Sequence, residues 1–183
     1  VHWIEEPQGG IAITLDVKGT VKRPSLKGRV VLENFQCRVP HFPLPLRNVN
    51  GSLRFRSSDV IFSGLKGVVG DSPVELSGKI TPDNSTVNGD GKINPVDLKR
   101  AGLPAFWEIS GIIPVTLSTK GRNANTDFSV KADLKGNGVR IGHVIRKEPG
   151  AVLALEASGT FGSDTLSVEE AYVVTEQARI SAK

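Results

Sequence analysis

Residues 86–97 form the segment of this chain with the clearest spacing for metal chemistry. Calcium loops of the EF-hand type place oxygen ligands at positions one, three, five and twelve, with glycine at six. Asn88, Asp90 and Asp97 occupy positions three, five and twelve of this segment, and position six is glycine. Position one is Thr86, which lacks the charge that a hard cation requires. We therefore interpret the segment as a strand, a Gly-Asp-Gly turn and a capped helix, with calcium at Asn88, Asp90 and Asp97 as the secondary hypothesis.

The run Gly70-Asp71-Ser72 could supply a nucleophile, because it is similar to the serine block of one esterase family. That chemistry needs a histidine base oriented by a carboxylate. His143 lies in a strand-like run, and the sequence contains no Gly-x-Ser-x-Gly elbow and no glycine-rich phosphate loop. Since Gly-Asp-Ser-Pro is typical of a turn, the sequence predicts a protein without enzyme activity or cofactor.

Other chemistry is limited by residue counts. Cys37 is the only cysteine and there are three histidines, which excludes an internal disulfide and disfavours a structural zinc site. The net charge is +4, but aromatic residues make up only 5%, so the stacking platform of single-strand nucleic-acid binders is lacking. We predict a solvated basic face and no nucleic-acid partner, with attraction to anionic lipid headgroups as a weaker alternative. The basic residues considered are Lys22, Arg23, Lys27, Arg29, Lys99, Arg100, Arg146 and Lys147.

The elements that position these residues read as β-strands. The chain has 183 residues, 38% of them hydrophobic, with 20 glycines and 11 prolines, which excludes a disordered chain and a membrane-spanning bundle. Apolar and polar residues alternate with period two through most of it, which predicts about ten to thirteen strands. Short turns favour antiparallel neighbours. One short helix is expected near 95–102, capped by Asn94, between possible submodules 1–94 and 103–183.

The predicted inner faces carry aliphatic side chains separated by glycines. Such thin faces fill a compact sandwich poorly, so they favour an all-β, strongly curved, groove-forming sheet (a taco, a half-barrel or an open sandwich). Because each lipid methylene that leaves water contributes about 0.8 kcal/mol, a continuous apolar groove could shield acyl chains without specific polar groups. The candidates for this groove are Ile13, Leu15, Val30, Leu32, Leu53, Phe55, Leu76, Val115, Leu117, Val130, Leu153 and Leu155.

Four stretches of the sequence carry recognisable turn and strand motifs. Residues 48–55 read Asn-Val-x-Gly-x-Leu-x-Phe, and residues 64–80 contain Gly-Leu-x-Gly, Gly-x-Ser and Leu-x-Gly in order. These two stretches resemble the recurring module of the AsmA-like family of bacterial envelope proteins, whose larger relatives include TamB and YhdP. Residues 97–122 resemble the short helix and following strands of that family, and residues 138–161 resemble its later repeats. The resemblance covers nearly the whole chain, and its motifs are turn and strand patterns with no catalytic residue to carry over.

The resemblance implies a periplasmic location and a parent protein anchored in the inner membrane by a segment outside this sequence. The lack of methionine, even at position 1, also leads us to expect a segment of a longer protein. The resemblance further implies a hydrophobic groove for phospholipid acyl chains, with a role in lipid movement between the two membranes or in outer-membrane biogenesis, and possible envelope-protein partners. The alternative from the residues is a structural or interaction module that pairs through exposed sheet edges.

Overall fold

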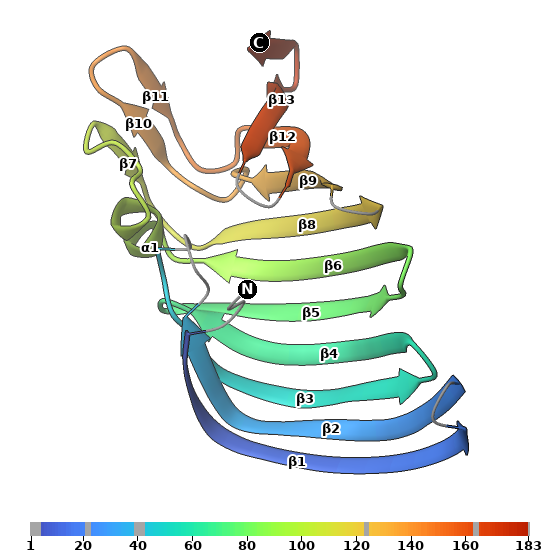
Figure 1. Cartoon of the computed structure of the whole chain (residues 1–183). Helices are drawn as coiled ribbons and strands as arrows, with labels where there is room; N and C mark the ends of the chain where they lie inside the picture. The colour runs from blue at the N-terminus through green and yellow to red at the C-terminus, as the bar shows by residue number, and fades with distance from the viewer. Residues whose placement is uncertain (1–4, 21–22, 39–42, 123–124, 163–164, 183) are drawn as a thin grey trace.

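The computed structural model describes residues 5–20, 23–38, 43–122, 125–162 and 165–182. Most of this part of the chain is one eleven-stranded antiparallel sheet, whose strands lie side by side in the order of the sequence (Figure 1). From one edge to the other they are β1 (Glu5–Thr20), β2 (Arg23–Arg38), β3 (Leu46–Arg56), β4 (Asp59–Val69), β5 (Ser72–Ile80), β6 (Asn84–Ile93), β8 (Ile113–Arg122), β9 (Asn125–Asp133), β12 (Leu153–Phe161), β13 (Leu166–Thr175) and β14 (Arg179–Ala182).

A small cap lies at one end of this sheet (Figure 1). It contains the helix α1 (Pro95–Arg100) and a three-stranded sheet of β7 (Trp107–Ile109), β10 (Val139–Ile141) and β11 (Ile145–Lys147), with β10 in the middle. The predicted fold class is confirmed: the protein is mainly antiparallel β with one short helix, and its main sheet is curved and open. There are fourteen strands among the described residues, more than expected, because three-residue strands carry too little alternation to be recognised.

The two predicted submodules share one sheet. β6 ends the first and β8 belongs to the second, and the two strands pair from Asn84 opposite Arg122 to Ile93 opposite Ile113. The helix and β7 therefore form a connection between neighbouring strands of a continuous layer.

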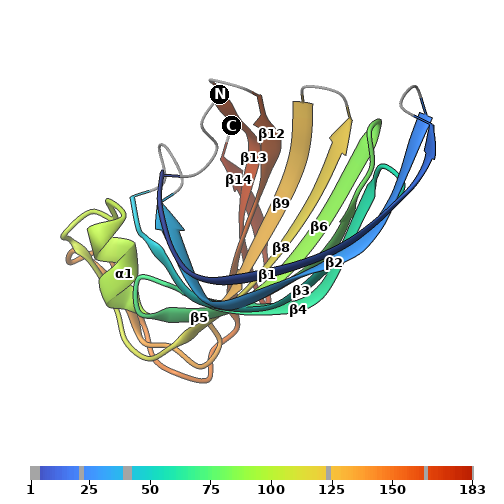
Figure 2. The ribbon, with the colours of Figure 1, turned by 60° about the horizontal axis from the view of Figure 1, so that its bottom comes forward.

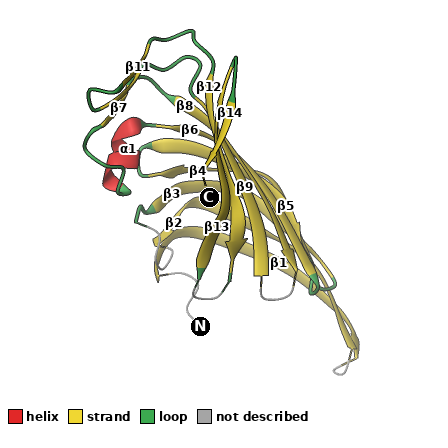
Figure 3. Ribbon diagram, turned by 90° about the horizontal axis from the view of Figure 1, so that it is seen from above, coloured by secondary structure: helices red, strands yellow, loops and turns green. Residues whose placement is uncertain are grey.

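The sheet is bent by irregularities that line up across its first strands. The registers of β1 with β2, β2 with β3 and β3 with β4 shift near Gly9, Asn34 and Asn48, and all three residues have positive φ. The Asn34 N–H donates to Asn50 Oδ1 at 2.9 Å, which fixes the bulge on β2 against β3. Because bulges bend strands and increase their twist, β1 and β2 turn sharply near the α1 end, and the sheet forms an open trough (Figures 2 and 3).

The cap is held to the main sheet by an apolar cluster and by one lysine. Ile113, Leu134 and Val139 are fully buried, and Leu98 of α1 packs against them. Lys147 Nζ lies 2.6 to 3.3 Å from four backbone carbonyl oxygens, among them those of Leu134 and Asn137. The predicted helix is confirmed with a slightly earlier end at Arg100, and its cap is Asn94, whose Oδ1 accepts from Val96 N–H at 3.0 Å.

Candidate functional site: an apolar trough

One face of the main sheet is mostly apolar across its width, and we call it the trough face. Directly opposite residues of antiparallel strands project to the same side, so the register assigns the faces. Ile13 lies opposite Val30, Val30 opposite Leu53, and Leu53 opposite Phe62. Along the paired residues from β2 to β12, every described side chain on this face is uncharged. The opposite face, which we call the outer face, carries the lysines, arginines, aspartates and glutamates.

Over β6, β8 and β9 the trough face is the more enclosed of the two. Residues of the same type allow a direct comparison: Thr119 and Thr126 on the trough face are half-buried, whereas Thr86 and Thr116 on the outer face are exposed. On a bent sheet, side chains converge on the concave side and spread apart on the convex side. The apolar residues therefore line the inside of the bend.

All twelve predicted groove residues project from the trough face, but they do not share one environment. Val115, Leu153 and Leu155 are partly buried and pack against the buried cluster beneath the cap. The sequence placed them in an open groove, whereas in the structure Ile109 of β7 and Val139 of β10 belong to the same cluster. The other nine lie on the part of the trough that the cap cluster does not include, namely Ile13, Leu15, Val30, Leu32, Leu53, Phe55, Leu76, Leu117 and Val130.

Glycines on the trough face allow large side chains to lie flat across the sheet. A Cβ at Gly78 would come within 2.8 Å of Phe62 Cζ, and one at Gly89 within 2.8 Å of Leu76 Cδ2. The neighbouring aromatic or aliphatic group already occupies the space above each glycine. The floor of the trough is therefore apolar and shallow, with bulky groups covering the backbone of adjacent strands.

Several buried residues of the trough face are not among the groove residues predicted from the sequence. Phe62 and Leu65 are 8% and 9% exposed and lie on β4, where the register shifts between them and Gly64 has φ +63°. That bulge breaks the period-two pattern, so alternation alone did not identify them. Phe35 packs with Cys37 and Val49 beside the bend, and it follows a similar register shift on β2. Burial in this cluster raises the pKa of the Cys37 thiol.

Much of the trough face remains in contact with solvent. Ile13 and Val17 of the edge strand β1 are 61% and 64% exposed, and the aliphatic residues of the middle strands are mostly only half-buried. Among the described residues, only the cap forms a second layer on this face. Continuous exposed apolar surface of this kind marks a binding surface for a protein, a membrane or an apolar ligand.

The calcium hypothesis is not supported by the positions of its three ligands. Residues 84–93 form β6, which pairs with both neighbours, so the expected Gly-Asp-Gly turn is extended strand. Asn88 Oδ1 accepts from Ser118 Oγ at 3.0 Å on the outer face, and Asp90 is exposed on the same face. Asp97 is buried in α1 with other partners. Within the described ranges, no group of three or more His, Cys, Asp or Glu side chains is placed to hold a metal ion.

Ser72 serves a structural role in the same region. Its Oγ donates to Asp97 Oδ2 at 2.6 Å and accepts from Asn94 N–H at 2.9 Å, and the Asp71 N–H donates to the same carboxylate at 2.8 Å. Burial raises the pKa of Asp97, but the hydrogen bonds from Ser72 and Asp71 and the nearby Arg100 lower it more, so the net shift is downward. Both Ser72 and Asp97 are 1% exposed. The network ties α1 to the β4–β5 turn. His143, the histidine considered as a base for this serine, lies instead at an exposed turn of the cap.

The outer face also contains a hollow, over β4 to β9, of about 640 Å³. A twisted sheet is saddle-shaped, so both of its faces can be concave. The charged side chains around this hollow balance: Lys66, Lys92 and Lys131 face Glu75, Asp90 and Asp133, and Lys66 pairs with Glu75 at 3.9 Å. The charged side chains around this hollow therefore leave no net charge to attract an ionic ligand.

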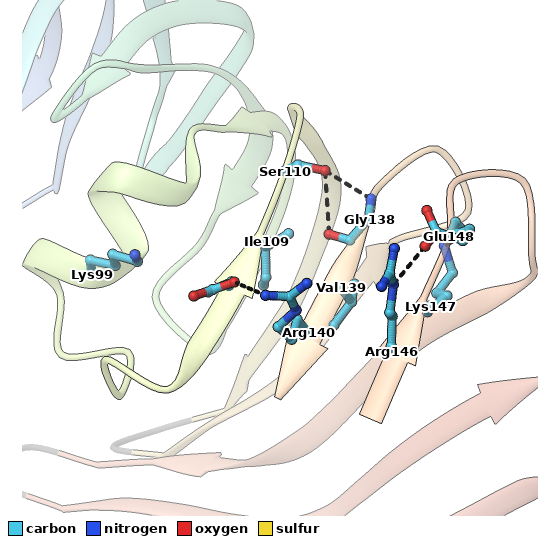
Figure 4. A pocket seen from close by; sticks show the side chains of 10 residues that line it. Lys99, Ile109, Ser110, Gly138, Val139, Arg140, Arg146, Lys147 and Glu148 are labelled. Carbon is cyan, nitrogen blue, oxygen red and sulfur yellow. Dashed lines mark hydrogen bonds and ion pairs between the residues drawn. The ribbon is translucent and has the colours of Figure 1, made fainter. Parts of the chain in front are cut away.

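A second hollow, of about 320 Å³, lies on the cap (Figure 4). It is lined by four basic and two acidic side chains, but these are largely engaged with each other. Arg146 pairs with Glu148 at 2.8 Å, and Arg140 pairs with Glu108 at 3.6 Å. Lys147 is held by backbone carbonyls, so three of the four cations, namely Arg140, Arg146 and Lys147, already have partners within the protein.

The chain matches no protein-family profile, no curated protein and no solved structure. Among the residues that the structure describes, no helix has the length and apolar character to cross a membrane.

Proposed function

We propose that this chain binds phospholipid acyl chains on the trough face, as a non-enzymatic segment of an AsmA-like protein. The observation that carries the proposal is the mostly apolar face that runs across eleven strands, of which, among the residues that the structure describes, only the cap covers part. The proposal extends to a periplasmic location, a parent protein anchored in the inner membrane, and lipid movement between the two membranes or outer-membrane biogenesis.

The chemistry of the trough fits an acyl chain better than a polar ligand. No charged side chain projects into it along the paired residues of β2 to β12, so a headgroup would find no counter-charge there. Each methylene that leaves water contributes about 0.8 kcal/mol to binding. The glycines of the trough floor present no polar side chain that a ligand would have to hydrogen-bond. The mechanism is passive: the aliphatic rows lower the free energy of an acyl chain outside a bilayer, while the headgroup stays in solvent.

The test compares neighbouring residues that point to opposite faces. The wild-type chain, a trough variant (Leu53→Gln with Leu117→Gln) and an outer-face control (Ser52→Gln with Ser118→Gln) are purified identically. Phospholipid is then measured by native mass spectrometry and by extraction. We expect copurifying phospholipid in the wild type and the control, and its loss in the trough variant, with all three folded by circular dichroism.

A lipid-free wild type, or equal lipid in both variants, would contradict the proposal. A lipid-free monomer would favour the alternative, a module that pairs through the exposed edge strand β1.

A further inference from the structure

Four basic side chains meet on the outer face of β2 and β3, and we call them the basic quartet. Lys27 lies directly opposite Arg56, and Arg29 lies directly opposite Arg54. All four are exposed. The sequence predicted Lys27 and Arg29 to be scattered on a solvated face. The cluster was not recognised there, because only the pairing of β2 with β3 brings Arg54 and Arg56 beside them.

This arrangement is unfavourable for the isolated sheet, since like charges directly opposite each other destabilise a strand pair. The nearest carboxylates across the neighbouring strands have other partners. Asp16, opposite Lys27, lies 3.3 Å from Lys18, and Asp59, opposite Arg56, lies 2.8 Å from Lys79. In the described part of the chain, no ion pair joins any quartet residue to a carboxylate. An external anion would remove the repulsion.

We propose that the basic quartet docks this end of the protein on an anionic phospholipid bilayer. The four cations stand on two neighbouring strands and on the same face, so an array of phosphates meets several of them at once, whereas a single soluble phosphate does not. The trough face of the same end carries Leu15 and Val17, which are 52% and 64% exposed. Cations on one face of this end and exposed aliphatic residues on its other face suit the boundary between headgroups and acyl chains.

A nucleic-acid surface fits these residues less well. Single strands are held by aromatic side chains between the cations, and Phe55, the aromatic residue between Arg54 and Arg56, projects to the trough face. The docking surface adds to the proposed trough, but it does not require the trough to hold lipid.

The test measures partition of the intact chain onto vesicles at low salt. Vesicles of phosphatidylcholine are compared with vesicles that also contain phosphatidylglycerol. The quartet variant is Arg29→Gln with Arg54→Gln. The control, Lys92→Gln with Lys120→Gln, removes the same charge from the outer face of β6 and β8, where neither lysine faces a cation. Each basic residue near an anionic surface contributes about fivefold to partition, so the quartet variant should bind about thirtyfold more weakly, and the control only slightly so.

We expect wild-type binding to require phosphatidylglycerol and to fall as salt is raised. Equal loss in both variants, unchanged binding of the quartet variant, or equal binding to the neutral vesicles would overturn the proposal. So would displacement by inorganic phosphate at matched ionic strength, or tighter binding to duplex DNA at the same salt. Because copurified lipid is measured separately, an empty trough and a failed docking surface are distinguishable.

Discussion

Gly78→Ala tests whether the trough floor depends on side chains that lie across glycines. A Cβ at position 78 would lie 2.5 Å from the carbonyl oxygen of Thr86 and 2.8 Å from Phe62 Cζ. The first contact is with backbone, so β5 and β6 must move apart. Overpacking of this kind costs about 1–3 kcal/mol, against a gain of about 0.5–1 kcal/mol for replacing a strand glycine.

The matched control is Gly91→Ala, on the same face of the adjacent strand. There the nearest atoms are Ile93 Cδ1 at 3.3 Å and Val74 Cγ1 at 3.4 Å, both ends of side chains that can adjust. We expect the free energy of unfolding of Gly91→Ala to stay within about 0.5 kcal/mol of the wild type. That of Gly78→Ala should fall by about 0.5–2 kcal/mol.

The assay is urea and thermal unfolding followed by circular dichroism. In a chain of this size 1 kcal/mol shifts Tm by about 2–4 °C, so Gly78→Ala should lower Tm by about 1–8 °C. Adding Phe62→Leu removes the ring contact but leaves the Thr86 contact, so it should relieve only part of the strain. Equal Tm values for the two alanine variants would refute the packing described for the floor.

Three further outcomes are expected. Arg54→Glu places a carboxylate opposite Arg29, which should raise the free energy of unfolding by about 0.5–1 kcal/mol at low salt. Thermal unfolding measures this gain, and an equal gain in 1 M salt would contradict the electrostatic explanation. Asp97→Asn should cost about 1–3 kcal/mol at neutral pH. Because the folded pKa of Asp97 is lowered, its contribution to stability is present above the unfolded pKa and is lost as pH falls through the folded pKa. The wild type should therefore lose stability below about pH 4, and the variant should lose less. Urea titrations at each pH will show the difference. The thiol of Cys37 should react with a thiol reagent only slowly in the folded protein, since it is buried with a raised pKa; rapid labelling without denaturant would contradict the packing beside the bend.

The faces of the sheet were predictable because period-two alternation is a local signal. Ile13, Val30, Leu53 and Leu117 could be assigned to one side from their own strands, and the turns indicated antiparallel order. The helix was predictable for the same reason, since Asn94 and Pro95 are local capping signals.

The bend and the cap were not predictable from local pattern. Asn34 and Asn48 adopt positive φ at bulges whose positions depend on three strands in register. Leu153 reads as an ordinary strand residue, and only the approach of β10, a separate strand of the cap, shows that it packs against a buried cluster. The basic quartet required the same kind of information, because Arg29 and Arg54 are neighbours only through the register of β2 and β3.

The most direct measurement of the central claim is photo-crosslinking from two adjacent positions of β3. Leu53 projects into the trough and Arg54 to the outer face. A photo-reactive amino acid at position 53 should give phospholipid adducts through the acyl chains, detected by mass spectrometry, and the same group at position 54 should not give acyl adducts. Absence of adducts from position 53, or equal acyl labelling from both positions, would contradict a lipid-binding trough.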